Sequence, residues 1–264
     1  MFLTWRNYRK IEDFTPVESV LLVLEIPRTN DKQELAAEQL FASLHGILRD
    51  NKELRLSGGH QEHISFEIAS VNGQIRFYVW VPKTLQSFVE GQIYSQYPTV
   101  QIHQADEDYT EHERDHEVAY STELTLTTDE FLPIRTFQNF EVDPLAGITG
   151  TLAKLETTGE ELWIQVLVRP IPDDWQNAAD RYINSIKNGR MFSLPGFGGS
   201  MQWLIGVLGA LWQPPEQGAN QSTAVELSDR DKTRISEAEK KATKLGYEVK
   251  IRLVYMGESQ TNAK

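Results

Sequence analysis

An Asn-Gly pair at residues 72–73 is the feature that most constrains the fold of this chain. It separates two stretches in which apolar and polar residues alternate, HISFEIAS before the pair and QIRFYVWV after it. Both central residues of a type I′ turn need a positive φ, and Asn-Gly is the strongest short sequence signal for such a turn. The pattern therefore predicts a β-hairpin, with Ile64, Phe66 and Ile68 on one face of its first strand.

The segments that flank the hairpin complete a compact unit over residues 17–104. The stretch VESVLLVLEIP alternates like a strand, and ELAAEQLFASLHGIL has apolar residues at helical spacing. After the hairpin, Pro82 suits the first turn of a second helix, Pro98 ends that helix, and TVQIH resumes as a strand. The predicted order, β-α-β-β-α-β, is that of a ferredoxin-like domain.

Beyond this unit the sequence predicts an acidic linker and a second α/β unit. Residues 104–117 hold seven acidic residues against one Arg, and such runs are usually solvated, so residues 105–116 are assigned as the linker. Residues 117–264 then alternate strand and helix patterns, among them the nearly continuous apolar strand EELWIQVLVRPI. This second unit is either a further, incomplete ferredoxin-like domain or another α/β arrangement. The fold class is α+β, and residues 1–16 form an N-terminal extension.

The composition narrows the classes of function. A formal net charge of -12 and a pI near 5.0 disfavour broad binding to phosphate backbones, which needs clustered Lys and Arg. There are no cysteines, so disulfides, zinc ribbons and thiol nucleophiles are excluded. No apolar stretch follows the basic residues Arg6, Arg9 and Lys10, so no signal peptide is expected. These features predict a cytoplasmic protein, and no cofactor is predicted.

Residues 191–215, MFSLPGFGGSMQWLIGVLGALWQPP, carry no charge. After the Pro and Gly residues, the part from 200 to 212 would make roughly 20 Å of helix, which is too short to cross a bilayer. A helix that is apolar on every side must be covered, either by the rest of the chain or by a membrane surface or partner protein. The second alternative gives the predicted contact residues: Phe197, Met201, Trp203, Leu204, Ile205, Val207, Leu208, Leu211 and Trp212.

Residues 112–116, HERDH, match the H-E-x-x-H pattern of zinc proteases. On a helix, His112 and His116 would share one face and bind zinc, with Glu113 as general base. The flanks are acidic rather than apolar, and no H-x-x-G-x-x-H pattern supplies a third ligand. A zinc metalloenzyme is therefore a disfavoured alternative, no metal site is predicted, and the absence of a P-loop pattern leaves no other enzyme class indicated.

A third class of function is the binding of single-stranded nucleic acid. Ferredoxin-like domains bind RNA through aromatic side chains on an open sheet face, and Tyr78 and Trp80 would lie on such a face. The ribonucleoprotein pattern is absent and the charge balance is acidic, so packing against the second unit is the competing explanation.

Several phrases of the sequence resemble a known family. They are LAAEQLFASLHGI, HISFEI, IRFYVWVPK, FVEGQIYSQYP followed by Asp-Tyr-Thr at 108–110, ELWIQVLVRP and GYEVKIRLV. This set resembles the uncharacterised N-terminal region, a domain of unknown function, of large proteins from candidate-phylum bacteria. Those proteins continue into type IV secretion or HerA/FtsK-like DNA-translocating ATPases. The resemblance spans most of residues 17–255, and the chain stops before any Walker motif, so no ATPase residue carries over.

The resemblance implies a non-catalytic module that docks a motor ATPase onto a secretion or membrane assembly. Its partners would be that ATPase or proteins of the membrane complex, with nucleic acid involved only indirectly, and a homo-oligomer is left open. The chain would then lie in the cytoplasm or peripherally at the inner face of the cytoplasmic membrane. Residues 191–215 would make the membrane or partner contact.

Overall fold

The computed structural model divides the chain into two compact units, which are described separately. The first unit comprises the described residues within Met1–Thr127, Arg135–Pro172 and Leu245–Lys264, and the second those within Thr128–Ile134 and Asp173–Lys244. The structure describes residues 17–27, 34–56, 58–111, 118–136, 139–141, 146–155, 160–187 and 227–257.

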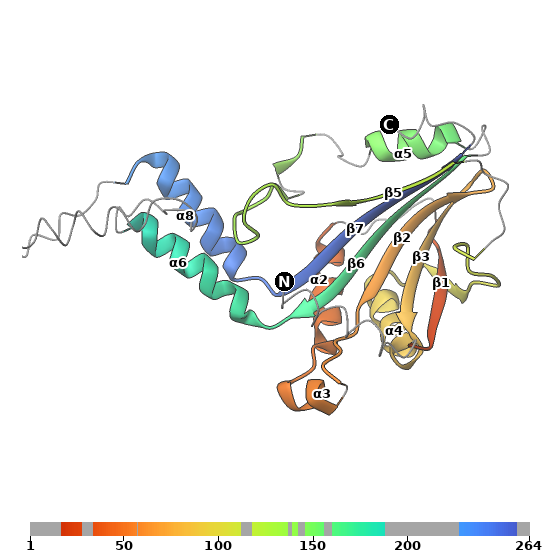
Figure 1. Cartoon of the computed structure of the whole chain (residues 1–264), viewed down its shortest axis with the longest axis horizontal. Coiled ribbons are helices and arrows are strands. Elements are labelled where there is room, and N and C mark those ends of the chain that lie inside the picture. The colour runs from red at the N-terminus through yellow and green to blue at the C-terminus, as the bar shows by residue number, and fades with distance from the viewer. Residues whose placement is uncertain are drawn as a thin grey trace, which may run out of the picture. The chain divides into compact units, whose positions relative to one another are not determined.

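A seven-stranded antiparallel sheet forms the first unit (Figure 1). Its strand order is β4-β1-β3-β2-β6-β7-β5. The strands are β1 (Ser19–Glu25), β2 (Ile64–Val71), β3 (Gln74–Pro82), β4 (Gln101–Gln104), β5 (Val118–Leu124), β6 (Glu161–Ile171) and β7 (Gly246–Gly257). The helices of this unit are α2 (Glu34–Leu44), α3 (Asn51–Leu56), α4 (Gln86–Gln96) and α5 (Ala146–Leu155).

The first four strands confirm the predicted β-α-β-β-α-β order. They lie as β4-β1-β3-β2, with every neighbouring pair antiparallel, which is the ferredoxin-like arrangement. The hairpin between β2 and β3 turns at Asn72 and Gly73, whose φ angles are 51° and 70°. Both values are positive, as a type I′ turn requires, so the turn fixes the register of the two strands.

The later strands extend this same sheet. β6 pairs with β2 from Ile64↔Val168 to Ser70↔Leu162, β7 pairs with β6, and β5 pairs with β7. In a ferredoxin-like domain on its own, β2 would be an edge strand with one row of unpaired backbone groups, and β6 pairs with that row. The α+β class is confirmed. The described strands of residues 117–264 are arranged as additions to the first sheet rather than as a sheet of their own.

Helices α2 and α4 cover one face of the sheet (Figure 1). Strand residues on this face alternate with residues on the other, so Leu22 and Val79 point toward the helices while Leu21 and Tyr78 point away. Burying an aliphatic side chain completely stabilises the fold by about 1.5–3 kcal/mol. The buried residues of this core are Val20, Leu22, Leu40, Leu44, Ile64, Val79, Val81, Val89, Ile93 and Val168.

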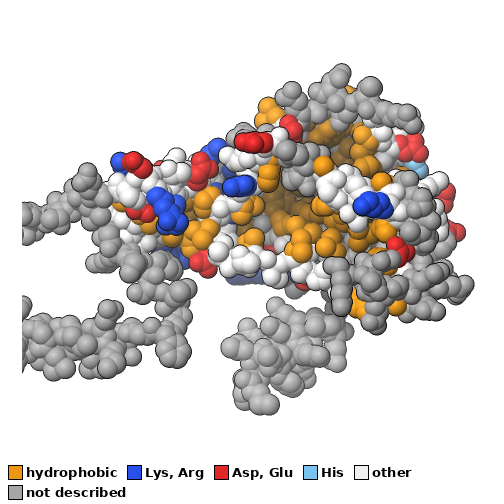
Figure 2. Space-filling view, turned by 90° about the horizontal axis from the view of Figure 1, so that it is seen from above, with side chains coloured by type: hydrophobic (Ala, Val, Ile, Leu, Met, Phe, Trp, Pro, Cys, Tyr) orange, Lys and Arg blue, Asp and Glu red, His pale blue; other side chains and the backbone are white. Residues whose placement is uncertain are grey.

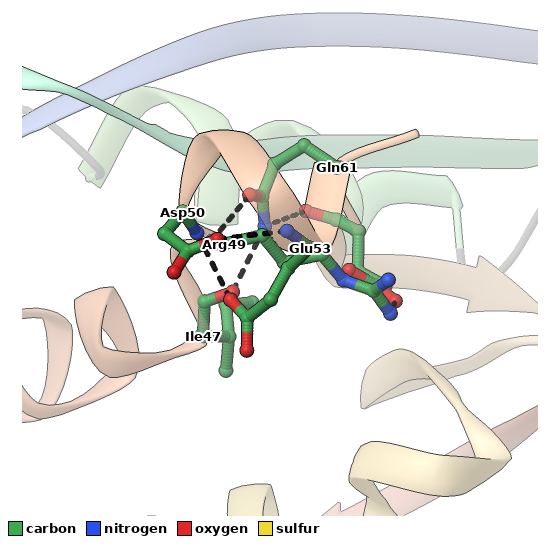
Figure 3. A network of polar contacts seen from close by, with 6 residues as sticks. Ile47, Arg49, Asp50, Glu53 and Gln61 are labelled. Carbon is green, nitrogen blue, oxygen red and sulfur yellow. Dashed lines mark hydrogen bonds and ion pairs between the residues drawn. The ribbon is translucent and has the colours of Figure 1, made fainter. Parts of the chain in front are cut away.

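A short helix, α3, lies between α2 and β2 and is held by a polar network (Figure 3). The backbone N–H of Asp50 donates to Glu53 Oε2 at 2.9 Å, and Asp50 Oδ1 accepts from the Glu53 N–H at 2.7 Å, which is a reciprocal helix cap. The amide of Gln61 bridges the same loop, accepting from the Arg49 N–H at 2.8 Å and donating to the Ile47 carbonyl at 3.0 Å. The network therefore fixes the chain just before β2.

The second unit is built on α6 (Gln176–Lys187) and α8 (Asp229–Ala242). Its small core consists of Ile183, Ile235 and Ala238, and Phe131 packs on Tyr182 with ring centroids 5.3 Å apart. Ser228 caps α8, with Oγ accepting from the Asp231 N–H at 3.2 Å.

Candidate functional site

A groove of about 380 Å³ lies on the sheet face opposite α2 and α4. Such a volume is near the lower end for small-ligand sites. Five neighbouring strands, β1, β3, β2, β6 and β7, form its floor, and His63, Asp108 and Thr110 outside the strands complete its lining. Its lining residues are Leu21, His63, Ser65, Glu67, Trp80, Asp108, Thr110, Trp163, Gln165, Leu167, Arg252 and Val254.

The strand register brings the polar floor residues into one row. Glu67 of β2 pairs with Tyr78 of β3 on one side and with Gln165 of β6 on the other. Gln165 pairs in turn with Arg252 of β7, which pairs with Glu123 of β5. Directly paired residues of an antiparallel sheet point to the same face, so these side chains, from β3 to β5, share the groove face.

Tyr109 covers part of this row. Its hydroxyl donates to Glu67 Oε2 and accepts from Gln165 Nε2 at 3.0 Å. Its ring centroid lies 4.8 Å from that of Tyr78 and 4.9 Å from that of Trp163. Burial, followed by the Glu67 carboxylate, raises the pKa of the Tyr109 hydroxyl far above its usual range. The hydroxyl therefore remains a donor over the whole physiological pH range.

His63 and Trp80 form the aromatic wall of the groove. Their rings are stacked, with centroids 4.8 Å apart and an interplanar angle of 16°. Burial lowers the pKa of the His63 imidazole, and the charges of His60 and Arg169 lower it further. His63 is therefore neutral at pH 7, and the wall is an uncharged π surface.

Ser65 supplies a buried hydroxyl that lacks a hydrogen-bond partner in the described part of the chain. Its side chain is 3% exposed, and its Oγ has no hydrogen bond to any residue that the structure describes. Leaving a buried polar atom unpaired costs about 1–3 kcal/mol, so such an atom in a groove is a potential contact for a ligand.

The charges around the groove are unequally paired. Arg252 donates to Glu123 Oε1 at 3.3 Å, and the nearby Arg169 forms a salt bridge with Glu248. Glu67 and Asp108 form no ion pair with a Lys or Arg of the described ranges; Glu67 is held by Tyr109, and Asp108 accepts from Thr110. Glu123 is shared between Arg252 and Lys250, which lies 3.5 Å from it, so it does not neutralise both bases. The groove is lined by two carboxylates and one guanidinium, and the carboxylates are in excess.

Residues 15–264 match the family described as a domain of unknown function, DUF8128. The chain belongs to this family. The match covers nearly all of the chain, which agrees with the expected uncharacterised domain. No curated protein and no solved structure matches this DUF8128 member.

The two aromatic residues predicted on the sheet face of this DUF8128 chain differ in their exposure. Trp80 is half-buried and lines the groove, but Tyr78 is only 4% exposed beneath Tyr109. The covering residue comes from the segment predicted to be a solvated linker, 105–116, and Tyr109 itself is 5% exposed. Within the described part of the predicted linker, Tyr109 is thus a buried residue of the sheet face rather than a solvated one.

Two other predictions lie outside the described residues. They concern the zinc pattern at His112, Glu113 and His116, and the contact residues Phe197, Met201, Trp203, Leu204, Ile205, Val207, Leu208, Leu211 and Trp212. Among the residues that the structure describes, no group of three His, Asp or Glu side chains is placed to hold a metal ion. No helix within the described ranges is both long and apolar enough to span a membrane.

The sequence contains polar residues at strand positions that become part of the groove, but their alternation with apolar residues does not by itself show that they are buried. Ser65 and Glu67 alternate with Ile64, Phe66 and Ile68, and Gln165 interrupts an otherwise apolar strand. All three polar residues are at most 9% exposed. Buried polar residues on adjacent strands indicate a site, but their adjacency follows from the β2–β6 pairing, which the sequence does not reveal.

Proposed function

We propose that this DUF8128 chain is a non-catalytic docking and assembly module of a type IV secretion-like DNA-transfer system, acting beside a motor ATPase. Two independent arguments support the proposal. The sequence phrases quoted above resemble the N-terminal regions of such ATPases, and the described sheet has an edge suited to binding another protein. The membership of DUF8128 is compatible with this role and does not by itself assign it.

The observation that carries the docking role is the exposure of β5. This strand is at one end of the sheet, and every residue after Val118 is exposed. An edge strand of this length presents unpaired N–H and C=O groups to which a partner can add a strand. Natural sheets usually blunt such edges with Lys or Pro, and β5, VAYSTEL, has neither.

Exposed apolar side chains lie beside that edge. Tyr120 and Leu124 of β5 are 42% and 55% exposed, and Val249 of β7 is 49% exposed. The register places all three on one face, because Leu124 pairs with Ile251 and Tyr120 pairs with Tyr255. Seen from the side on which α5 lies in Figure 1, hydrophobic side chains gather around a hollow in the surface (Figure 2). Exposed apolar patches of this kind mark interaction sites.

The experiment is site-specific photo-crosslinking in the native host. A photoreactive amino acid at Thr122 of β5 is compared with the same residue at Lys52 of α3, since both side chains are exposed. The proposal expects Thr122, and not Lys52, to crosslink an ATPase with a Walker motif or a membrane component of its assembly. Recovery of the same products from both positions, or of neither class of protein from Thr122, would contradict it.

Residues 191–215 are proposed as a second contact of the same module, with a membrane surface at the inner face of the cytoplasmic membrane or with a partner. Trp203→Asp and Leu208→Asp place charge in this apolar stretch. The pair of changes is expected to abolish flotation with liposomes of anionic phospholipid or co-purification with the crosslinked ATPase. If both measurements stay at the level of the unmodified chain, these residues are not the contact.

A further inference from the structure

We propose that the groove binds the guanidinium group of an arginine side chain presented by a partner protein. This inference deepens the proposed docking function and depends on it, because it names the chemical group by which a partner is recognised. It is carried by residues of β1, β2, β3, β6 and β7 and by the segment after β4, and does not involve β5 pairing or residues 191–215.

The aromatic lining suits a planar cation. Trp80 is half-buried in the groove with His63 stacked on it, and Trp163, which is 5% exposed, also lines the groove. The face of an indole attracts a cation, and a guanidinium adds planar stacking that an ammonium lacks. His63 contributes no competing positive charge, because burial keeps its imidazole neutral at pH 7.

The charge of the groove selects the sign of the ligand. Glu67 and Asp108 line it without a basic partner in the described ranges, whereas Arg252 donates a guanidinium N–H to Glu123, which Lys250 also contacts. The chain as a whole carries a formal net charge of -12, so its long-range field also favours a cationic partner. A guanidinium can donate to the free lone pairs of both carboxylates, since each of its N–H groups points outward in one plane.

The hydroxyl of Ser65 provides an independent indication of a ligand. It is buried at 3% exposure, lines the groove, and has no partner among the described residues. An additional donor placed in the groove would satisfy this oxygen, and a guanidinium has five N–H donors to distribute. A purely aromatic ligand would stack on Trp80 but would leave Ser65 unpaired.

The test is calorimetric titration of the purified full chain with the blocked peptide acetyl-Gly-Arg-Gly-amide. The matched ligand has citrulline in place of arginine, which keeps the shape and removes the charge. A lysine peptide tests planarity, and an eight-nucleotide single-stranded DNA tests the nucleic-acid alternative. The expected result is saturable binding of the arginine peptide and at least tenfold weaker binding of the citrulline and lysine peptides. A tenfold loss of affinity is about what the loss of one charge-assisted contact causes.

Two variants assign the binding to the groove. Glu67→Gln keeps an acceptor for Tyr109 and removes the charge, so about tenfold weaker binding is expected. Ser65→Ala removes a hydroxyl that has no partner in the described structure, so the fold is retained and peptide affinity falls about threefold to tenfold. The control, Glu18→Gln, changes an exposed carboxylate outside the groove and is expected to bind as the unmodified chain does.

Several outcomes would overturn the inference. They are equal affinity for arginine and citrulline peptides, equal affinity for arginine and lysine peptides, unchanged binding by Ser65→Ala, or DNA binding that exceeds peptide binding. Absence of binding at peptide concentrations up to about 10 mM, roughly the weakest affinity expected for a single side chain, would also overturn it. The docking function is tested separately, since crosslinking from Thr122 does not require the groove.

Discussion

Tyr109 joins two buried polar side chains for which the described residues provide no other hydrogen bond. Its hydroxyl donates to Glu67 and accepts from Gln165, and all three residues are at most 9% exposed. We expect Tyr109→Phe to lower the free energy of unfolding by about 1–3 kcal/mol, because it leaves two buried polar groups unsatisfied while keeping the ring. Urea denaturation followed by tryptophan fluorescence measures the change.

The matched control for this variant is Tyr94→Phe. The Tyr94 hydroxyl also accepts a hydrogen bond, from the Ile102 N–H at 3.3 Å, but its side chain is 41% exposed and water can replace the hydroxyl. Its effect should be within about 0.5 kcal/mol. Equal losses for the two variants would show that the Tyr109 contacts add nothing beyond those of an exposed tyrosine.

His63 makes the stability depend on pH. The pKa of its imidazole is lowered in the folded chain, first by burial and then by His60 and Arg169, from the ordinary value of 6.5 that applies to the unfolded chain. As pH falls below about 6.5, the unfolded chain binds the proton first. This group therefore contributes stability above pH 6.5, and its contribution is lost progressively as the pH falls toward the folded pKa.

The prediction is that His63→Gln flattens the decline of the urea midpoint as the pH falls below about 6.5. The measurement is a series of urea titrations at closely spaced pH values, because only the slope, and not the stability at one pH, reports the imidazole. His103→Gln is the control, since His103 is exposed on β4. A slope that His63→Gln leaves unchanged would assign the pH dependence to other groups.

The candidate site shows what residue patterns can and cannot reveal. Trp80 was predicted on an open sheet face and does line the groove. Tyr78, two residues away on the same face, was expected to be equally available, but Tyr109 covers it. Periodicity assigns a side chain to a face; it does not report that a residue from another part of the chain packs there.

At the scale of single elements, the turn between β2 and β3 allows a paired prediction. Gly73 has a φ of +70°, a conformation that a side chain disfavours, so Gly73→Ala is expected to destabilise the fold by about 1–3 kcal/mol. Gly91 lies inside α4, and a Cβ there would meet no atom within 4 Å. Gly91→Ala is therefore expected to stabilise the fold by about 0.5–1 kcal/mol, because alanine favours helix.

The two glycine variants are compared in one set of urea titrations. They make the same chemical change, so opposite signs can come only from the backbone conformation of each position. If Gly73→Ala were neutral, the hairpin would have to turn without a positive φ at residue 73, and the register from Ser65↔Trp80 to Val71↔Gln74 would need another explanation.

The elements were predictable to the extent that their signals are local. The hairpin, the two long helices of residues 17–104 and the Ser228 cap all follow from residues within a few positions of one another. Helix α3 was not among the predicted elements, although Asp50 and Glu53 have the spacing of a reciprocal cap. Its six residues contain no buried side chain, so no apolar periodicity marked it.

At the scale of the whole molecule, the sequence pattern and the structure group the strands differently. The pattern divides the chain at an acidic run, yet β6 pairs with β2 across roughly a hundred residues of sequence. Nothing local specifies such a pairing, because it depends on the unpaired outer side of β2 and the apolar face of β6 meeting during folding. Apart from the continuous apolar run of β6, the sequence carries no sign of it.

The two compact units differ in how much core supports them, and this difference is measurable. Leu22 is fully buried in the large core beneath α2 and α4, whereas Ile235 belongs to a core of three buried residues between α6 and α8. A smaller core opens locally at a lower free energy, so the second unit is expected to exchange its amide hydrogens faster than the sheet does. Ile235→Ala should increase exchange in α6 and α8 and leave β1, β2 and β3 protected.

Leu22→Ala is the counterpart, expected to cost about 2–5 kcal/mol and to increase exchange throughout the sheet. Hydrogen exchange followed by mass spectrometry resolves the two patterns within one chain. Loss of protection in β1–β3 on Ile235→Ala, to the extent seen with Leu22→Ala, would mean that the units unfold as one. Separate responses would mean that the helical unit can open while the sheet keeps intact both the groove and the β5 edge, so that partner binding to the sheet does not require the second unit to be folded.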